Sequence, residues 1–217
     1  MNVGETSGGW IRLRYMVRGI ILFLAFLSSA ALGAVEEARG LDFTFYRGQF
    51  TGTTLGNIML KGDTEYQPSY IFTGAVSAPA SVDFFGLPTE WEGQVVHHSG
   101  AQKHLEFNAV LMARVGDSLD FSGVPVSFAV GEGLSLATRN PDLENPRSFY
   151  GIDGESEYSQ NLLNYLVFEV EFGLPMDAYE PRAFIRLHHR SGIYGTFCPR
   201  TCGSNYIAYG IKFSPFE

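Results

Sequence analysis

Two polar residues near the C-terminus, His189 and Ser191, have the types and the spacing of a nucleophile and its general base. They lie in the segment RAFIRLHHRSG, in which apolar and polar residues alternate. If this segment is a β-strand, residues two apart share a face, so His189 and Ser191 continue the apolar row of Ala183, Ile185 and Leu187. A serine hydroxyl can attack an ester carbonyl when an imidazole removes its proton. The pair is therefore a candidate for ester hydrolysis, although a serine and a histidine near a strand end are more often interfacial polar residues than a catalytic pair.

The next apolar run, SNYIAYGIKF, supplies a third polar residue. The same alternation places Asn205 in the apolar row that ends at Phe213. A hairpin of the two runs would bring Asn205 next to His189 and Ser191. An amide oxygen can accept a hydrogen bond from the imidazole and fix its tautomer, but it lacks the charge of a carboxylate. The backbone N–H of Gly192, where the strand ends, is a candidate oxyanion donor.

Eight runs of alternating apolar and polar residues predict an all-β fold for the chain after residue 34. Turn-rich segments separate the runs, including a loop up to residue 63, a turn region over 77–88 and a long polar loop over 139–160. We expect strands at about 41–50, 69–76, 90–98, 104–115, 124–137, 161–172, 182–191 and 204–213.

One face of these runs is nearly free of charge, and the other carries charges of both signs that could pair inside a barrel. Closure would remove the edges of an eight-stranded sheet, and the longer loops would all lie at one end. We therefore expect residues 35–217 to form an eight-stranded antiparallel transmembrane up-and-down β-barrel. A soluble lipocalin-like barrel, with the polarity of the faces reversed, is the alternative. The expected lumenal residues are Glu92, His98, Glu106, Arg114, Glu169, Glu171, Arg186 and Arg190.

Residues 1–34 have the organisation of a secretory signal peptide. Three arginines precede a short apolar run over 19–27, and small residues follow up to Ala34, so we expect cleavage near Gly33 or Ala34. The alternative is an uncleaved membrane helix, but the run is shorter than the roughly 20 residues that span a bilayer. Met16 is an alternative start, because a complete signal follows it. The signal predicts export.

The formal net charge of −8 argues against nucleic acid as a partner, because binding phosphates needs clustered Lys and Arg. The two cysteines, Cys198 and Cys202, lie in the loop between the last two runs. In an exported chain a disulfide between them is the preferred interpretation. Zinc would need further ligands, and only His188 and His189 are near in sequence. We therefore expect no metal ion in this protein.

The motif HHRSG at 188–192, followed by GSN at 203–205 in a single barrel domain, resembles the PagL-type lipid A 3-O-deacylases of Gram-negative outer membranes. The resemblance covers most of the chain after the first two strands and is typical of a divergent branch. It extends to GEGLS at 131–135, to NYLVFE at 164–169, and to Glu92, His98 and Glu106. It implies an eight-stranded outer-membrane barrel that hydrolyses, without a cofactor, the ester-linked acyl chain at position 3 of lipid A.

The resemblance assigns the family's His-x-Ser pair, which faces lipid on the penultimate strand, to His189 and Ser191. The family's acidic residue on the last strand has no counterpart, because residues 192–216 contain no Asp or Glu. Asn205 is the best-placed substitute. Glu132 is a second candidate if the glycines that flank it form no β-bulge, although strand six would lie between it and His189.

Two arginines, Arg190 and Arg200, are candidates for binding the phosphates of lipid A. The alternation places Arg190 inside the barrel, so the alternative role for Arg190 is an ion pair in the lumen. The expected function is an outer-membrane esterase, with lipopolysaccharide and outer-membrane lipid as partners. The missing acid leaves a second hypothesis, a catalytically silent barrel with a structural, adhesive or lipid-binding role.

Overall fold

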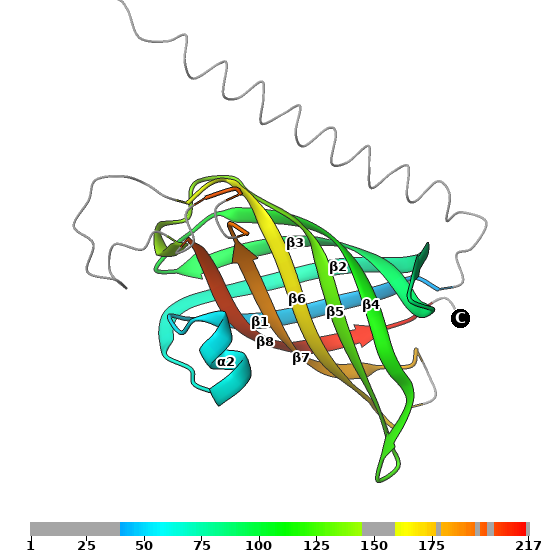
Figure 1. The fold of residues 1–217 in the computed structure, drawn as a ribbon. Coiled ribbons are helices and arrows are strands. Elements are labelled where there is room, and N and C mark those ends of the chain that lie inside the picture. Colours follow the sequence, from blue (N-terminus) through cyan, green and yellow to red (C-terminus); the bar gives the residue numbers. More distant parts are fainter. Residues whose placement is uncertain (1–39, 145–158, 177–178, 194–195, 199–201, 216–217) are drawn as a thin grey trace, which may run out of the picture. The chain divides into compact units, whose positions relative to one another are not determined.

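In the computed structural model, which describes residues 40–144, 159–176, 179–193, 196–198 and 202–215, eight antiparallel strands form a closed barrel (Figure 1). Each strand pairs with the next along the chain, and β1 pairs with β8 to close the sheet. The expected all-β, eight-stranded, up-and-down barrel is confirmed. Its strands are β1 (Asp42–Thr51), β2 (Tyr66–Phe84), β3 (Leu87–Gly100), β4 (Leu105–Phe121), β5 (Val124–Ala137), β6 (Leu162–Gly173), β7 (Arg182–Ser191) and β8 (Gly203–Phe213).

Two strands are longer than the sequence pattern predicts. Residues 77–84, expected as a turn region, belong to β2, and β4 continues to Phe121. Proline is rare in the interior of a strand because it has no N–H to donate. Pro79 is tolerated in β2 because β1 begins at Asp42, opposite Ser77, and does not extend as far as Pro79. Pro79 therefore has a partner strand on one side alone, where it pairs with Glu90 of β3.

The connections differ between the two ends of the barrel. At the end where β1 begins and β8 ends, which we call the turn end, β2 and β3 join through Phe85 and Gly86, both at positive φ. The opposite end, the loop end, carries the β1–β2, β3–β4, β5–β6 and β7–β8 connections. The β1–β2 connection contains a short helix, α2 (Leu55–Lys61), which the sequence did not predict. In the described part of the chain, no helix is both long enough and apolar enough to cross a membrane.

The outer wall of the barrel is apolar. Its most exposed strand residues include aromatic and branched side chains with 45 to 59% of their surface accessible. Charged side chains on this wall include Glu132 on β5 and Arg47 on β1, whose guanidinium lies 4.8 Å from the centre of the Tyr70 ring. The apolar set includes Phe45, Phe72, Val95, Phe128, Val130, Leu134, Ile185 and Tyr209.

The lumen near the turn end is filled by a network of buried ion pairs. Arg186, fully buried, donates to Glu92 at 2.6 Å and to Glu169 at 2.8 Å. Lys212 lies 3.4 Å from Glu169, and Arg114 donates to the same carboxylate at 3.0 Å. Because each charge has partners of opposite sign within hydrogen-bonding distance, the network offsets part of the cost of removing these groups from water. The expected pairing of charges inside the barrel is confirmed.

A second network of imidazoles and hydroxyls fills the lumen near the loop end. Glu106 accepts hydrogen bonds from His188 at 3.0 Å and from His98 at 2.8 Å. The other ring nitrogen of His188 lies 2.9 Å from the Tyr165 hydroxyl. The ring of His104, in the β3–β4 connection, stacks on His98. Burial, followed by the neighbouring His98, lowers the pKa of His104 to about 3, so its ring is neutral at pH 7.

Replacing Arg186 by methionine tests the energetic role of the turn-end network. Arg186→Met leaves the buried Glu92 and Glu169 without their shared cation, and removing one partner of a buried pair costs about 3 to 5 kcal/mol. We expect the folded form to lose its resistance to heat and denaturant in gel-mobility assays. Arg47→Met, which removes an outward-facing arginine, is the matched control and should change the free energy of unfolding by less than about 1 kcal/mol. Equal effects of the two substitutions would contradict the role of the network.

Candidate functional site

Strands β7 and β8 place the three sequence-predicted residues on the outer wall at the loop end. Their register pairs His189 with Asn205 and Ser191 with Gly203. The intervening Arg190, like His188, is fully buried, so His189 and Ser191 occupy the outward-facing positions of the alternation. The hairpin thus brings His189 and Asn205 side by side, with Ser191 two residues further along β7.

Asn205 holds the imidazole of His189 by a short hydrogen bond. The Asn205 Oδ1 and His189 Nδ1 atoms are 2.6 Å apart, and Asn205 Nδ2 donates to the backbone carbonyl of Thr53 at 2.9 Å. A carbonyl oxygen only accepts, so the amide nitrogen must face Thr53 and the amide oxygen must face His189. Nδ1 of His189 then carries the proton, and Nε2 is the nitrogen that can remove a proton from a nucleophile.

No pattern in the sequence indicates that Thr53 supports the site. Its carbonyl is held where the chain leaves β1, because the Oγ1 atoms of Thr51 and Thr53 both accept the backbone N–H of Glu65, at 3.0 and 2.9 Å. Thr51 Oγ1 also donates to Thr53 Oγ1 at 3.1 Å. The segment Thr51–Gly52–Thr53 has no unusual feature in the sequence. The register of β1 against β8, which pairs Thr51 with Asn205, brings the Thr53 carbonyl within reach of the Asn205 amide.

Ser191 is half-buried, and no hydrogen bond joins it to His189 in the described part of the chain. Its neighbours across the sheet are Asn164 of β6 and Gly203 of β8. Residues i and i+2 on one face of a strand are separated by about 7 Å along the backbone, so a nucleophile–base contact needs both side chains to rotate toward each other. Catalytic hydrogen bonds are often long in enzymes without substrate and shorten when substrate binds.

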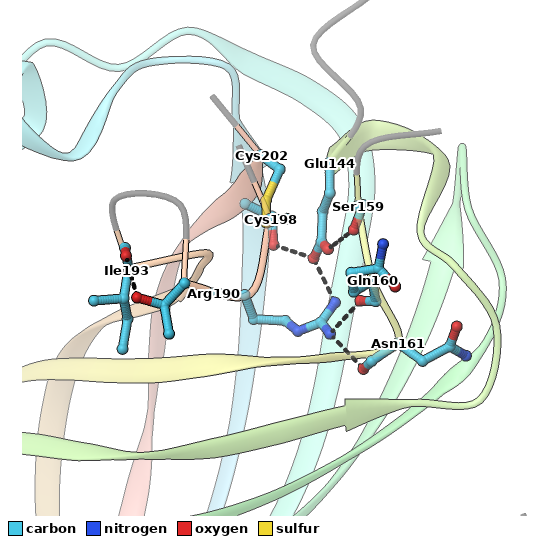
Figure 2. Close-up of a disulfide and its surroundings, with 10 residues drawn as sticks. Glu144, Ser159, Gln160, Asn161, Arg190, Ile193, Cys198 and Cys202 are labelled. Carbon is cyan, nitrogen blue, oxygen red and sulfur yellow. Dashed lines mark hydrogen bonds and ion pairs between the residues drawn. A yellow bond between two sulfur atoms is a disulfide. The ribbon is translucent and has the colours of Figure 1, made fainter. Parts of the chain in front are cut away.

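The β7–β8 loop packs directly on Gly192. A Cβ atom at Gly192 would lie 2.4 Å from the Cys198 sulfur and 2.5 Å from the Cys198 carbonyl oxygen, so a larger residue does not fit there. Cys198 and Cys202 are joined by a disulfide (Figure 2). Both cysteines pack on Leu163 of β6. Cys198 therefore packs against the end of β7, next to the candidate oxyanion donor.

The inner side of the same strand segment is held by Glu144, from the short 3-10 helix η2 (Asp142–Glu144). Glu144 accepts hydrogen bonds from Arg190 at 2.6 Å, Ser204 at 2.8 Å and Ser159 at 2.7 Å (Figure 2). Arg190 also donates to the carbonyl of Asn161 at 2.9 Å. Arg190 is fully buried and so does not reach the outer wall, where it would bind a lipid phosphate. Its ion pair with Glu144, the alternative to phosphate binding, is present instead.

The second candidate acid, Glu132, is on the outer wall but not beside the histidine. No β-bulge occurs at the glycines that flank it, since the pairing of β5 with β4 and β6 is continuous there. Glu132 pairs with Leu166, which in turn pairs with His189, so a whole strand separates acid and imidazole by roughly 10 Å. Arg200 lies outside the described residues.

The assignment of the His189 tautomer can be measured directly. In ¹⁵N-histidine-labelled protein in detergent micelles, we expect His189 to show the Nδ1–H form, identified by the loss of its signals in His189→Gln. Asn205→Ala removes the acceptor and should convert this signal to a mixture of both tautomers. An Nε2–H form in the unsubstituted protein would contradict the hydrogen-bond direction.

No protein-family model and no curated protein sequence matches the chain. Among solved structures, the fold is similar to the one described as the outer membrane enzyme PagL, with a TM-score of 0.47 and 12% sequence identity. The similarity covers 79% of this chain and 98% of the PagL chain. At this identity the comparison concerns the barrel fold.

Proposed function

We propose that this protein is an outer-membrane esterase that removes an ester-linked 3-hydroxyacyl chain from lipid A. The observation that carries the proposal is the hydrogen bond between Asn205 and His189, beside Ser191, on an apolar outward-facing wall. The resemblance of HHRSG and GSN to the lipid A deacylase motifs supports the choice of substrate.

The polarity of the barrel supports a membrane location. Most side chains that point outward are apolar and exposed, whereas most arginine, lysine and glutamate side chains of the strands are paired inside. A water-soluble barrel of the lipocalin type has the opposite arrangement, and transmembrane barrels have an apolar outer face. With the short turns in the periplasm, the loop end faces the cell exterior. His189 and Ser191 then lie near the outer leaflet, where the ester bonds of lipid A are found.

The chemistry follows the general scheme of acyl transfer. His189 Nε2 removes the hydroxyl proton of Ser191, whose oxygen attacks the ester carbonyl carbon. The N–H of Gly192 stabilises the oxyanion, and collapse of the intermediate expels the alcohol of the sugar, which takes the proton from His189. Water then hydrolyses the acyl-serine with the same base. Asn205 keeps the imidazole in the required tautomer but supplies no negative charge to the imidazolium, so we expect a slower reaction than an acid-containing site would give.

Expression in a Gram-negative host that lacks such an enzyme tests the proposal by mass spectrometry of lipid A. The unsubstituted protein should convert lipid A to a species lacking one hydroxyacyl chain, and Ser191→Ala should abolish this conversion. Asn205→Ala should reduce the rate by roughly 5- to 150-fold, the effect of about 1 to 3 kcal/mol for a lost buried hydrogen bond.

Matched controls come from β3, where Ser99 and His97 occupy outward-facing positions of the alternation near the loop end. Ser99→Ala and His97→Ala should leave conversion unchanged. If a heat-modifiable, correctly inserted barrel leaves lipid A intact, the esterase proposal is wrong and the silent-barrel hypothesis is supported.

Replacing Asn205 by aspartate separates charge from position. The new carboxylate would stabilise the protonated His189, so we expect the rate of deacylation to rise by about tenfold. The same change removes the donor to the Thr53 carbonyl and places two acceptor oxygens together, so the free energy of unfolding should fall by about 1 to 3 kcal/mol. A slower reaction with unchanged stability would contradict this view of Asn205.

A further inference from the structure

The β3–β4 hairpin gathers three metal-ligating side chains inside the barrel at the loop end, away from the candidate esterase site. His98 is an inward-facing residue near the end of β3, His104 ends the connection, and Glu106 is the next inward-facing residue of β4. One ligand atom of each residue lies within 4.8 Å of the others. The three residues are 0, 8 and 0% exposed.

His104 has unused ligand capacity. Both of its ring nitrogens are buried without a hydrogen-bond partner among the described residues. Its ring stacks on that of His98 with 3.9 Å between the ring centres and 17° between the planes, so the two rings lie side by side and would tilt toward each other to bind one ion. A buried polar atom without a partner costs free energy, and most such atoms in folded proteins have a partner that satisfies them. A bound cation would give one of the two His104 ring nitrogens a partner.

His98 and Glu106 already share a proton in the position that a cation would take. His98 Nε2 lies 2.8 Å from Glu106 Oε2, and His98 Nδ1 lies 3.2 Å from the Tyr206 hydroxyl. If an ion replaces the proton on Nε2, the proton moves to Nδ1, because the Tyr206 hydroxyl can accept as well as donate. His188 donates to the other oxygen of Glu106 at 3.0 Å and so orients the carboxylate, as partners of metal ligands commonly do.

We propose that His98, His104 and Glu106 bind a divalent transition-metal ion of the Zn²⁺ class, with water in the fourth position. Two imidazoles and one carboxylate suit Zn²⁺, Co²⁺ or Ni²⁺, whereas Ca²⁺ and Mg²⁺ require oxygen ligands. The nearest cation, Arg190, lies 3.8 Å from Glu106 but is neutralised by Glu144 at 2.6 Å, so a charge remains on Glu106 for the ion.

The proposed site is independent of the esterase chemistry, because its ligands point into the lumen and Ser191 and Asn205 point outward. All three ligands belong to one hairpin, so the ion would join the end of β3 to the start of β4. Binding to the folded state alone stabilises that state by mass action. The consequence is a barrel whose resistance to unfolding at the loop end depends on transition-metal supply.

The experiment refolds the full chain into detergent micelles with excess Zn²⁺ or Co²⁺ present, so that the ion can enter before the barrel closes. After dialysis, we expect one equivalent of metal per chain, and the Co²⁺ form should show the intense visible absorption of a tetrahedral site. Mg²⁺ and Ca²⁺ should not compete. The metal-loaded barrel should unfold at higher temperature than the same barrel treated with a chelator.

Two histidine variants decide whether these residues hold the ion. His104→Phe keeps an aromatic ring to stack on His98 but removes the ligand nitrogens, and it should weaken binding by roughly 100-fold or more. His97→Ala removes the outward-facing neighbour of His98 and should leave the affinity and the cobalt spectrum unchanged. Absence of bound metal in the folded protein would overturn the proposal. Equal binding by His104→Phe and the unsubstituted barrel would also overturn it, since it would show that the ion binds elsewhere.

Discussion

The enclosure of charge inside the barrel is the constraint on which the rest of the structure depends. Arg186, Lys212, Glu92 and Glu169 are almost completely buried, and each is stabilised only because partners from other strands meet it across the lumen. Strand pairing fixes these inward positions, and the two-residue alternation then fixes what faces outward. A shift of one residue in β7 would expose Arg186 on the apolar wall and bury His189. The place of the candidate site thus follows from the ion pairs on the opposite face of the same strand.

The loop end combines this constraint with local support from three connections. Glu144 holds Arg190 from inside, between His189 and Ser191, and the loop that contains Cys198 packs on Gly192. The β1–β2 connection contributes the Thr53 carbonyl that orients Asn205. An aspartate at position 205 has no N–H to donate to this carbonyl. The amide of Asn205 and the Thr53 carbonyl therefore form a matched pair. This arrangement supports a site in which Asn205, oriented but uncharged, is the third residue beside His189 and Ser191.

Much of this organisation could be predicted from alternation alone, because side-chain direction in a strand has a period of two. The bounds of β5 and β7 agree with the pattern, and so do the inward positions of Glu106 and Arg190. The sequence pattern missed the extension of β2 because Pro79 argues against a strand. Only the structure shows that β1 does not extend as far as Pro79, so that Pro79 has a partner strand on one side alone. The roles of Thr53 and Glu144 depend on contacts between residues 152 and 46 positions apart, which no local pattern contains.

The central claim is that His189 activates Ser191 on the lipid-facing wall. The most direct measurement is labelling of isolated outer membranes with a fluorophosphonate that carries an acyl chain, followed by peptide mass spectrometry. The account predicts a covalent phosphonate on Ser191 that is lost in His189→Gln, with no labelling of Ser99 on the same wall. An unlabelled Ser191 in the inserted barrel, or equal labelling in His189→Gln, would contradict it.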